Sequence, residues 1–169
     1  MPSHPRSTAL ISALLCCAAL GSAQAHEVWI APEDWTPEPG APIAASLRNG
    51  HDFSGFGLIW NAETTERAEL WTAEGMAQID GRLGDRPALA TTAPGDGPAT
   101  LLYQSTYREI VYDSYDTFAG FVTEKGYAPV LEAHAARGLS QVSVKEAYKR
   151  FAKALLSVGD GAAQSDAVV

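Results

Sequence analysis

The sequence predicts a mainly β fold, in which a sandwich-like antiparallel domain is followed by two or three α-helices. Apolar and polar residues alternate in several short runs of the first half, which is typical of half-buried strands. Turns rich in proline and glycine separate these runs. After Tyr112 the apolar residues recur at helical spacing instead. Together these observations favour a β-sandwich with helices toward its C-terminus.

Five runs of the first half are predicted strands. Turn signals lie between them at Asn49-Gly50, at Glu74-Gly75 and in the Pro-Gly-Asp-Gly-Pro segment at 94–98. A stiff, proline-rich connection at 32–42 separates the first strand from the second. The alternating residues are, in chain order, Val28 and Ile30; Ile43, Ala45 and Leu47; Phe56, Leu58 and Trp60; Ala68, Leu70 and Thr72; and a fifth run at 100–105.

Three segments of the second half are predicted helices. The first covers Tyr115 to Lys125, and the second runs from Pro129 toward Arg137; a glycine follows each of them and can end it. The third begins at Ser143, which forms a capping-box pattern with Glu146. Its apolar stripe consists of Tyr148, Phe151, Ala152, Leu155 and Leu156. Residues 160–169 are small and polar, and they predict a disordered tail.

The first 25 residues have the three parts of a secretory signal. Arg6 supplies a basic start, residues 9–20 are apolar, and Ala23 and Ala25 form a small-x-small end. We therefore expect a mature chain that begins at His26 and is periplasmic or secreted, with one domain at 26–159. This mature chain contains no apolar segment of transmembrane length. Both cysteines fall inside the signal, so we expect neither disulfides nor thiolate metal ligands.

Composition and motifs exclude several classes of function. The chain has 20 acidic and 12 basic residues and a formal charge of −8, which opposes nucleic-acid binding and mildly favours cations. It lacks a Gly-x-Ser-x-Gly elbow and a phosphate-binding glycine loop. No pair of carboxylates has a spacing that indicates glycoside hydrolysis. We therefore assign no catalytic residue and favour a function that is not enzymatic.

The histidines are the candidate metal ligands. At the start of a mature chain, His26 could chelate one ion through its α-amine and its imidazole Nδ1. His51 follows the second predicted strand, so an antiparallel pairing of the first two strands would bring His26 and His51 to one end of the sandwich. His134, in the second predicted helix, is the third candidate. Nitrogen donors of this kind suit Ni(II) or Cu(II), and Glu27, Asp52 or a water molecule could complete the coordination.

Three segments carry a family resemblance. They are Ala-His-Glu-Val-Trp-Ile at 25–30, Asn-Gly-His-Asp-Phe at 49–53, and the Tyr-x-Arg-x-Ala-Lys segment within 147–156. Together they resemble the exported NikM-type family, which is described as nickel-uptake substrate-specific and is otherwise of unknown function. The resemblance covers most of residues 25–159 and implies a periplasmic β-rich domain that handles a transition metal. His26 and His51 fall on the histidine-bearing motifs of that family, whereas His134 does not.

The resemblance also implies a difference in length. Similar proteins continue past the Tyr-x-Arg-x-Ala-Lys segment into a second β-rich portion, whereas this sequence continues into the short polar tail. We therefore expect either a truncated variant or a core that is complete without that portion. If the second portion normally covers the apolar stripe that ends at Leu156, the stripe would be exposed here.

These observations lead to one favoured function and two alternatives. We expect a periplasmic protein that binds Ni(II) or Cu(II) and passes the ion to a partner, such as a membrane transporter or a metal-delivery protein. The first alternative is an exported β-sandwich interaction module without a metal, in which the histidines are incidental. The second is a copper-dependent oxidative enzyme, which would also need an open coordination position and a substrate surface.

Overall fold

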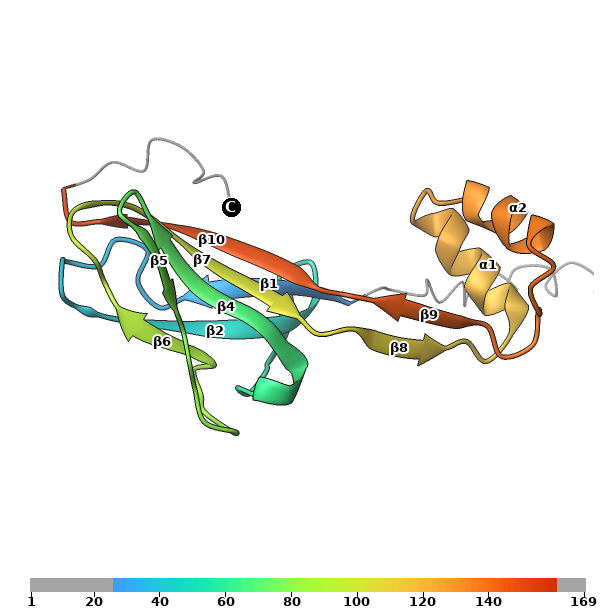
Figure 1. Cartoon of the computed structure of the whole chain (residues 1–169), viewed down its shortest axis with the longest axis horizontal. Coiled ribbons are helices and arrows are strands. Elements are labelled where there is room, and N and C mark those ends of the chain that lie inside the picture. Colours follow the sequence, from blue (N-terminus) through green and yellow to red (C-terminus); the bar gives the residue numbers. More distant parts are fainter. Residues whose placement is uncertain (1–25, 161–169) are drawn as a thin grey trace, which may run out of the picture.

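Two antiparallel four-stranded sheets face each other, and a two-stranded arm that ends in two helices extends from one end of them (Figure 1). The structure is a computed structural model that describes residues 26–160. The predicted signal at 1–25 and almost all of the predicted tail at 160–169 lie outside the described residues. A mainly antiparallel β fold with a sandwich-like arrangement agrees with the prediction.

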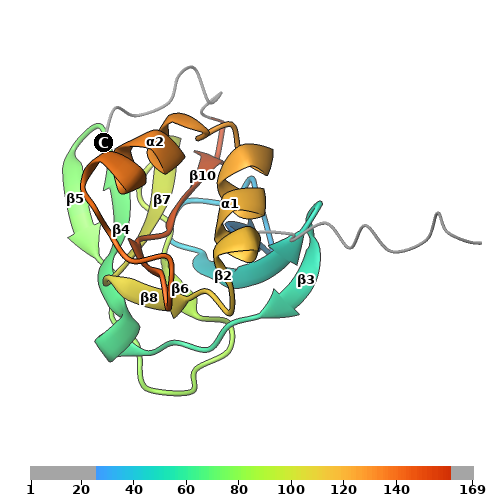
Figure 2. The same cartoon turned by 90° about the vertical axis from the view of Figure 1, so that its right-hand side faces the viewer.

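The first sheet is built on the long strand β2. Strand β1 pairs with one edge of β2, and β3 and β6 share the other edge, because β1 and β3 both pair with residues 48–50. Figure 2 shows β2 and β3 on one side of the molecule and β4 and β5 on the other. The strands are β1 (Glu27–Pro32), β2 (Pro42–His51), β3 (Ser54–Gly57) and β6 (Leu89–Thr92).

The second sheet has the strand order β10-β7-β4-β5. Its inner face and that of the first sheet supply one core, which includes Leu47, Leu70, Leu101 and Leu156. The loop after β1 runs along the outer edge of β10, where the Ser157 amide donates to the Trp35 carbonyl at 3.0 Å. The elements are η1 (Ala62–Thr64), β4 (Thr65–Thr72), β5 (Gly75–Gln78), β7 (Gly97–Ser105) and β10 (Phe151–Val158).

The arm and its helices form the remaining part of the chain. Strand β8 (Arg108–Val111) pairs with β9 (Lys145–Tyr148), and α1 (Tyr115–Glu124) and α2 (Pro129–Ala136) connect them. Both helices agree with the prediction, and each is followed by a glycine with positive φ, Gly126 at 75° and Gly138 at 63°. They are inserted between two strands, however, and do not follow the whole β domain. None of the helices in residues 26–160 is long and apolar enough to cross a membrane.

The third predicted helix, from Ser143 onward, is wrong. Its residues form β9 and β10, and Ser143 has a φ of +54° in place of a helix cap. The segment has apolar residues at both helical and strand spacing, and pairing with β7 selects the strand. Its inward residues Ala152, Ala154, Leu156 and Val158 are all buried. Leu156 is 0% exposed and Phe151 is 66% exposed, so the predicted apolar stripe is divided between the core and the surface.

Two smaller predictions about the first sheet are also wrong. Asn49 and Gly50 lie within β2, and the turn comes three residues later, at Asp52 and Phe53. The third predicted strand ends at Gly57, so Trp60 lies beyond it, although Trp60 is only 5% exposed and packs in the core. The short strands β5, β6, β8 and β9 were not predicted.

Candidate functional site

The predicted histidine site lies at the end of the β1–β2 pair. The pairing runs to Glu27 opposite Gly50, so the same register continued by one residue sets His26 opposite His51. Directly opposed residues of an antiparallel pair point to the same face of the sheet. In β2 that face is the inner one, because His51 continues the alternation of the buried residues Leu47 and Asn49. The antiparallel pairing of β1 with β2 agrees with the prediction and ends beside both histidines.

A tight hairpin holds His51 in place. His51 pairs with Ser54 across a two-residue turn, in which Asp52 and Phe53 have φ values of 48° and 57°. Both are left-handed conformations, which are matched to a type I′ hairpin but are costly for a bulky residue such as phenylalanine. Below the turn the two strands approach so closely that a Cβ on Gly50 would lie 2.0 Å from the Ser54 carbonyl oxygen. Glycine at this position is therefore required by the hairpin.

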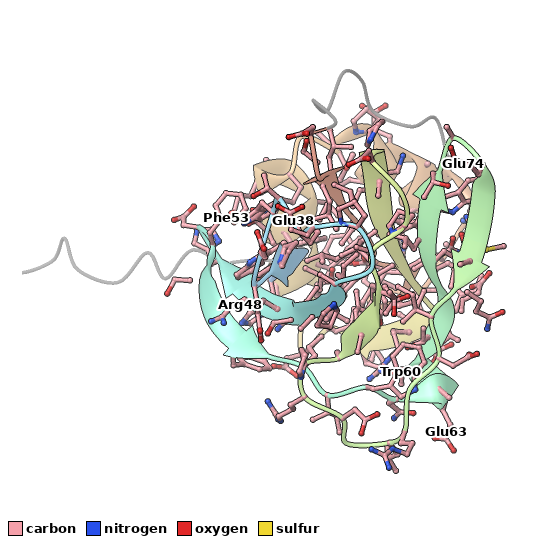
Figure 3. The ribbon with its side chains drawn as sticks, turned by 90° about the vertical axis from the view of Figure 1, so that its left-hand side faces the viewer. Glu38, Arg48, Phe53, Trp60, Glu63 and Glu74 are labelled. Carbon is pink, nitrogen blue, oxygen red and sulfur yellow. The ribbon has the colours of Figure 1, made fainter. Side chains whose placement is uncertain are left out.

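An aromatic contact fixes the tip of this hairpin. The ring of Phe53 meets that of Trp29 edge to face at 5.7 Å, although 78% of Phe53 is exposed. The guanidinium of Arg48 lies 6.0 Å from the centre of the Trp29 ring and donates to the carbonyl of Gly55. Figure 3 shows Phe53 at the outer end of the hairpin, on the side of the molecule away from Trp60. The turn beside His51 is thus held by contacts to both β1 and β3.

The imidazole of His51 has one accessible and one buried nitrogen. Nε2 lies 3.1 Å from Oδ2 of Asp52, and the His51 side chain is 34% exposed. Nδ1 is buried and has no hydrogen-bond partner among the described residues. An incoming ion could therefore reach Nε2 and the Asp52 carboxylate, which is exposed.

His26 is exposed and borders a pocket of about 440 Å³ between the sandwich and the arm. The opposite wall carries Tyr112, whose hydroxyl donates to the carboxylate of Glu146. Burial, together with this carboxylate, raises the pKa of Tyr112 well above its usual range. The hydroxyl therefore stays protonated at neutral pH and continues to donate to Glu146.

The structure places His134 elsewhere. It lies on α2, at the tip of the arm, and its Nε2 is 2.9 Å from the carbonyl oxygen of Ser140. Its ring packs against Tyr115 at 5.8 Å and Phe118 at 5.4 Å between ring centres. These contacts give His134 a structural role in the helical tip. Across residues 26–160, no three side chains of His, Asp or Glu are grouped closely enough to hold a metal ion.

Sequence reasoning missed a second pocket, of about 330 Å³, at the end of the sandwich nearest the arm. It is lined by residues of β1, β2, β3, η1, β7 and β8, together with Arg150 between β9 and β10. Two of its polar residues, Asn49 and Tyr103, are 7% and 5% exposed. Asn49 could have indicated this pocket from the sequence, because it is a polar residue on the inward face of a strand whose preceding inward residues are apolar.

Tyr103 is a buried polar residue of this second pocket. Burial raises the pKa of Tyr103, and a hydrogen bond with Thr65 and the positive charges of Arg150 and Arg108 partly offset that effect. The Tyr103 hydroxyl lies 3.4 Å from the carbonyl oxygen of Thr64.

Comparison with known proteins identifies a family but no function. The family described as Domain of unknown function (DUF4198) matches residues 23–169. No curated protein and no solved structure matches the chain. The resemblance to the NikM-type family remains a prediction beside this result. Because the match covers nearly the whole chain, the protein belongs to the DUF4198 family of domains of unknown function.

Proposed function

We propose that this protein captures Ni(II) or Cu(II) in the periplasm and passes the ion to an uptake or delivery partner. The observation that carries the proposal is the β1–β2 register, which when continued by one residue sets His26 opposite His51 at a strand end. Two histidines beside the same strand end, on a protein with a charge of −8, would suit a divalent transition-metal ion. The proposal includes export and cleavage after Ala25.

The donor atoms are those that solvent can reach. His51 would bind through Nε2, because its Nδ1 is buried. Asp52 Oδ2, 3.1 Å from that nitrogen, would supply a carboxylate oxygen. This separation is compatible with two neighbouring donors that each lie about 2.1 Å from one ion. His26 would contribute its imidazole.

The remaining donor would come from the backbone. The side chains of His26, His51 and Asp52 are not grouped closely enough in the structure to hold an ion by themselves, so the proposal also depends on the α-amine of His26. This amine exists only if the mature chain begins at that residue. His134 is left out, because its Nε2 is engaged with the Ser140 carbonyl in the helical tip.

The test compares two chains that differ only in their first residues. One begins at His26, and the other begins at Ser22, so that its His26 is internal. Both are titrated with Cu(II), Ni(II) and Zn(II) by calorimetry, and the Cu(II) complexes are examined by electron paramagnetic resonance. We expect Cu(II) or Ni(II) to bind the His26 chain at least about tenfold more tightly, with nitrogen hyperfine structure in the Cu(II) spectrum.

Two substitutions complete the design. His51→Ala should weaken binding to the His26 chain, whereas His134→Ala should leave it unchanged. Equal, weak binding by the two starting chains would contradict the proposal, and so would a His51→Ala protein that binds as tightly as the parent.

One observation favours the interaction module as a second candidate function. Apolar side chains are exposed along the arm and its tip, including Ile110 (46%), Val111 (50%) and Val142 (78%). Exposed apolar residues gathered on one part of a protein are typical of surfaces that contact other proteins. If the metal titrations fail, this is the function that the structure favours next. Replacing Val111 and Val142 by glutamate, with the fold retained by circular dichroism, should then abolish any complex that the protein forms.

A further inference from the structure

The pocket of about 330 Å³ at the end of the sandwich has the features of a small-molecule site. Its volume is within the usual range of ligand pockets, and about half of its lining is apolar, including Leu47, Phe56 and Leu58. The proposed metal site uses none of its lining residues. Its occupant can therefore be inferred separately, from the polar groups that it contains.

The charge of this pocket is opposite to that of the protein. Two arginines, Arg108 and Arg150, line it, and none of its lining residues is aspartate or glutamate. Within residues 26–160 neither arginine has a carboxylate within ion-pair distance, and the guanidinium of Arg150 instead lies 5.2 Å from the centre of the Tyr148 ring. In a chain with 20 acidic residues, two uncompensated arginines beside one apolar pocket indicate an anionic ligand.

A buried polar atom gives a second, independent indication. Asn49 lines the pocket and is only 7% exposed, and its side-chain oxygen has no hydrogen-bond partner in the part of the chain that the structure describes. An unsatisfied buried acceptor destabilises a fold, so an atom of this kind on an otherwise apolar strand face indicates a missing hydrogen-bond partner. A ligand that donates a hydrogen bond would supply that partner.

We propose that this pocket binds a small organic carboxylate whose apolar body carries a hydroxyl group. The carboxylate would lie between Arg108 and Arg150, where guanidinium groups can donate paired hydrogen bonds to it. The apolar body would contact Leu47, Phe56 and Leu58, and the hydroxyl would donate to Asn49 Oδ1, which is buried and would meet the ligand when the Asn49 side chain turns toward the cavity. Each of the three parts of the ligand thus meets a matching part of the pocket.

The experiment uses three related probes in buffer that contains EDTA, so that its result is independent of the proposed metal site. The probes are para-hydroxyphenylacetate, its neutral analogue para-hydroxyphenylethanol, and phenylacetate, which lacks the hydroxyl. Calorimetry on the chain that begins at His26 should show para-hydroxyphenylacetate binding about tenfold or more tightly than the neutral analogue. Phenylacetate should bind with intermediate affinity.

Variants then assign the contacts. Arg108→Gln and Arg150→Gln should each remove most of the preference for the acid over the neutral analogue. Arg82→Gln is the matched control, because it removes the same charge from an exposed side chain that does not line the pocket. Asn49→Leu should retain phenylacetate binding but lose the added affinity that the hydroxyl provides. It should also stabilise the free protein, which distinguishes a binding residue from a structural one.

Several results would overturn the proposal. Equal affinity for the acid and the neutral analogue would do so, as would arginine variants that bind like the Arg82→Gln control. Absence of measurable binding by para-hydroxyphenylacetate at millimolar concentration would also contradict it. None of these results bears on Cu(II) or Ni(II) binding, so either proposal can be contradicted without the other.

Discussion

The sandwich and the helical tip are built on very different amounts of buried apolar surface. Among residues 26–160, the sandwich core contains eighteen buried residues, whereas the core of the tip contains four: Tyr112, Phe118, Val122 and Val144. The two parts are joined by β8 and β9, and every residue of β8 is exposed. Since cooperative stability follows buried apolar area, the comparison indicates a stable sandwich that carries a tip able to open by itself.

The largest expected effect is on the sandwich. Leu156→Ala removes a fully buried side chain from the core and should lower the free energy of unfolding by about 2–5 kcal/mol. Denaturant unfolding followed by tryptophan fluorescence measures this change. Val142→Ala is the control, because Val142 is 78% exposed and should change stability by less than about 0.5 kcal/mol. Equal effects of the two substitutions would contradict the assignment of Leu156 to the core.

The second prediction concerns the tip. Phe118 packs against Tyr112 at 5.3 Å and against His134 at 5.4 Å between ring centres. Phe118→Ala should unfold α1 and α2. The substitution lowers the free energy of unfolding by about 3–5 kcal/mol, and the core of the tip has only four residues. Hydrogen exchange should lose protection at 115–136 and keep it in β7 and β10. Loss of protection in both parts together would mean that the tip and the sandwich unfold as one unit.

A smaller effect should appear on the outer face of the sandwich, as a dependence of stability on pH. Arg67 donates two hydrogen bonds to the buried Glu69 carboxylate, at 2.8 and 2.6 Å, and Trp71 donates a third at 2.7 Å. The Arg67 hydrogen bonds are the main reason that the pKa of Glu69 is lowered from 4.5. The folded state therefore binds this proton less readily than the unfolded state, and the resulting stability is present above pH 4.5 and is lost as pH falls through the lowered pKa.

Glu69→Gln tests this ion pair. The substitution keeps the shape of the side chain and removes its charge, so it should reduce stability at pH 7 by about 1–3 kcal/mol. The difference between the two proteins should shrink when unfolding is measured below pH 4. A difference that stays constant down to acidic pH would contradict the proposed role of the charge.

Local signals made the helices of the tip predictable. Ser114 caps α1 by accepting a hydrogen bond from the Thr117 amide at 3.1 Å, and a glycine follows each helix. The segment at 143–158 carried a similar cap and stripe, and there the prediction was wrong. This segment forms a strand because it pairs with β7, which lies more than forty residues earlier in the chain. Long-range pairing of this kind is not readable from local spacing.

The two candidate sites also differ in whether the sequence alone could predict them. The pairing that ends beside His26 and His51 was predictable, because it needs only one antiparallel pair of neighbouring strands. The second pocket was not, since its walls come from six elements and two connecting segments. Arg108 and Arg150 have no distinctive sequence context, and only the arm brings them to the pocket that Asn49 also lines.

The proposed metal site depends most directly on where the mature chain begins. The protein should be expressed from its complete sequence, recovered from the periplasm, and measured by intact mass spectrometry with N-terminal sequencing. We expect a chain that begins at His26 and copurifies with, or readily takes up, Ni(II) or Cu(II). A mature chain that begins at any other residue would leave His26 without its own α-amine and would contradict the proposed site.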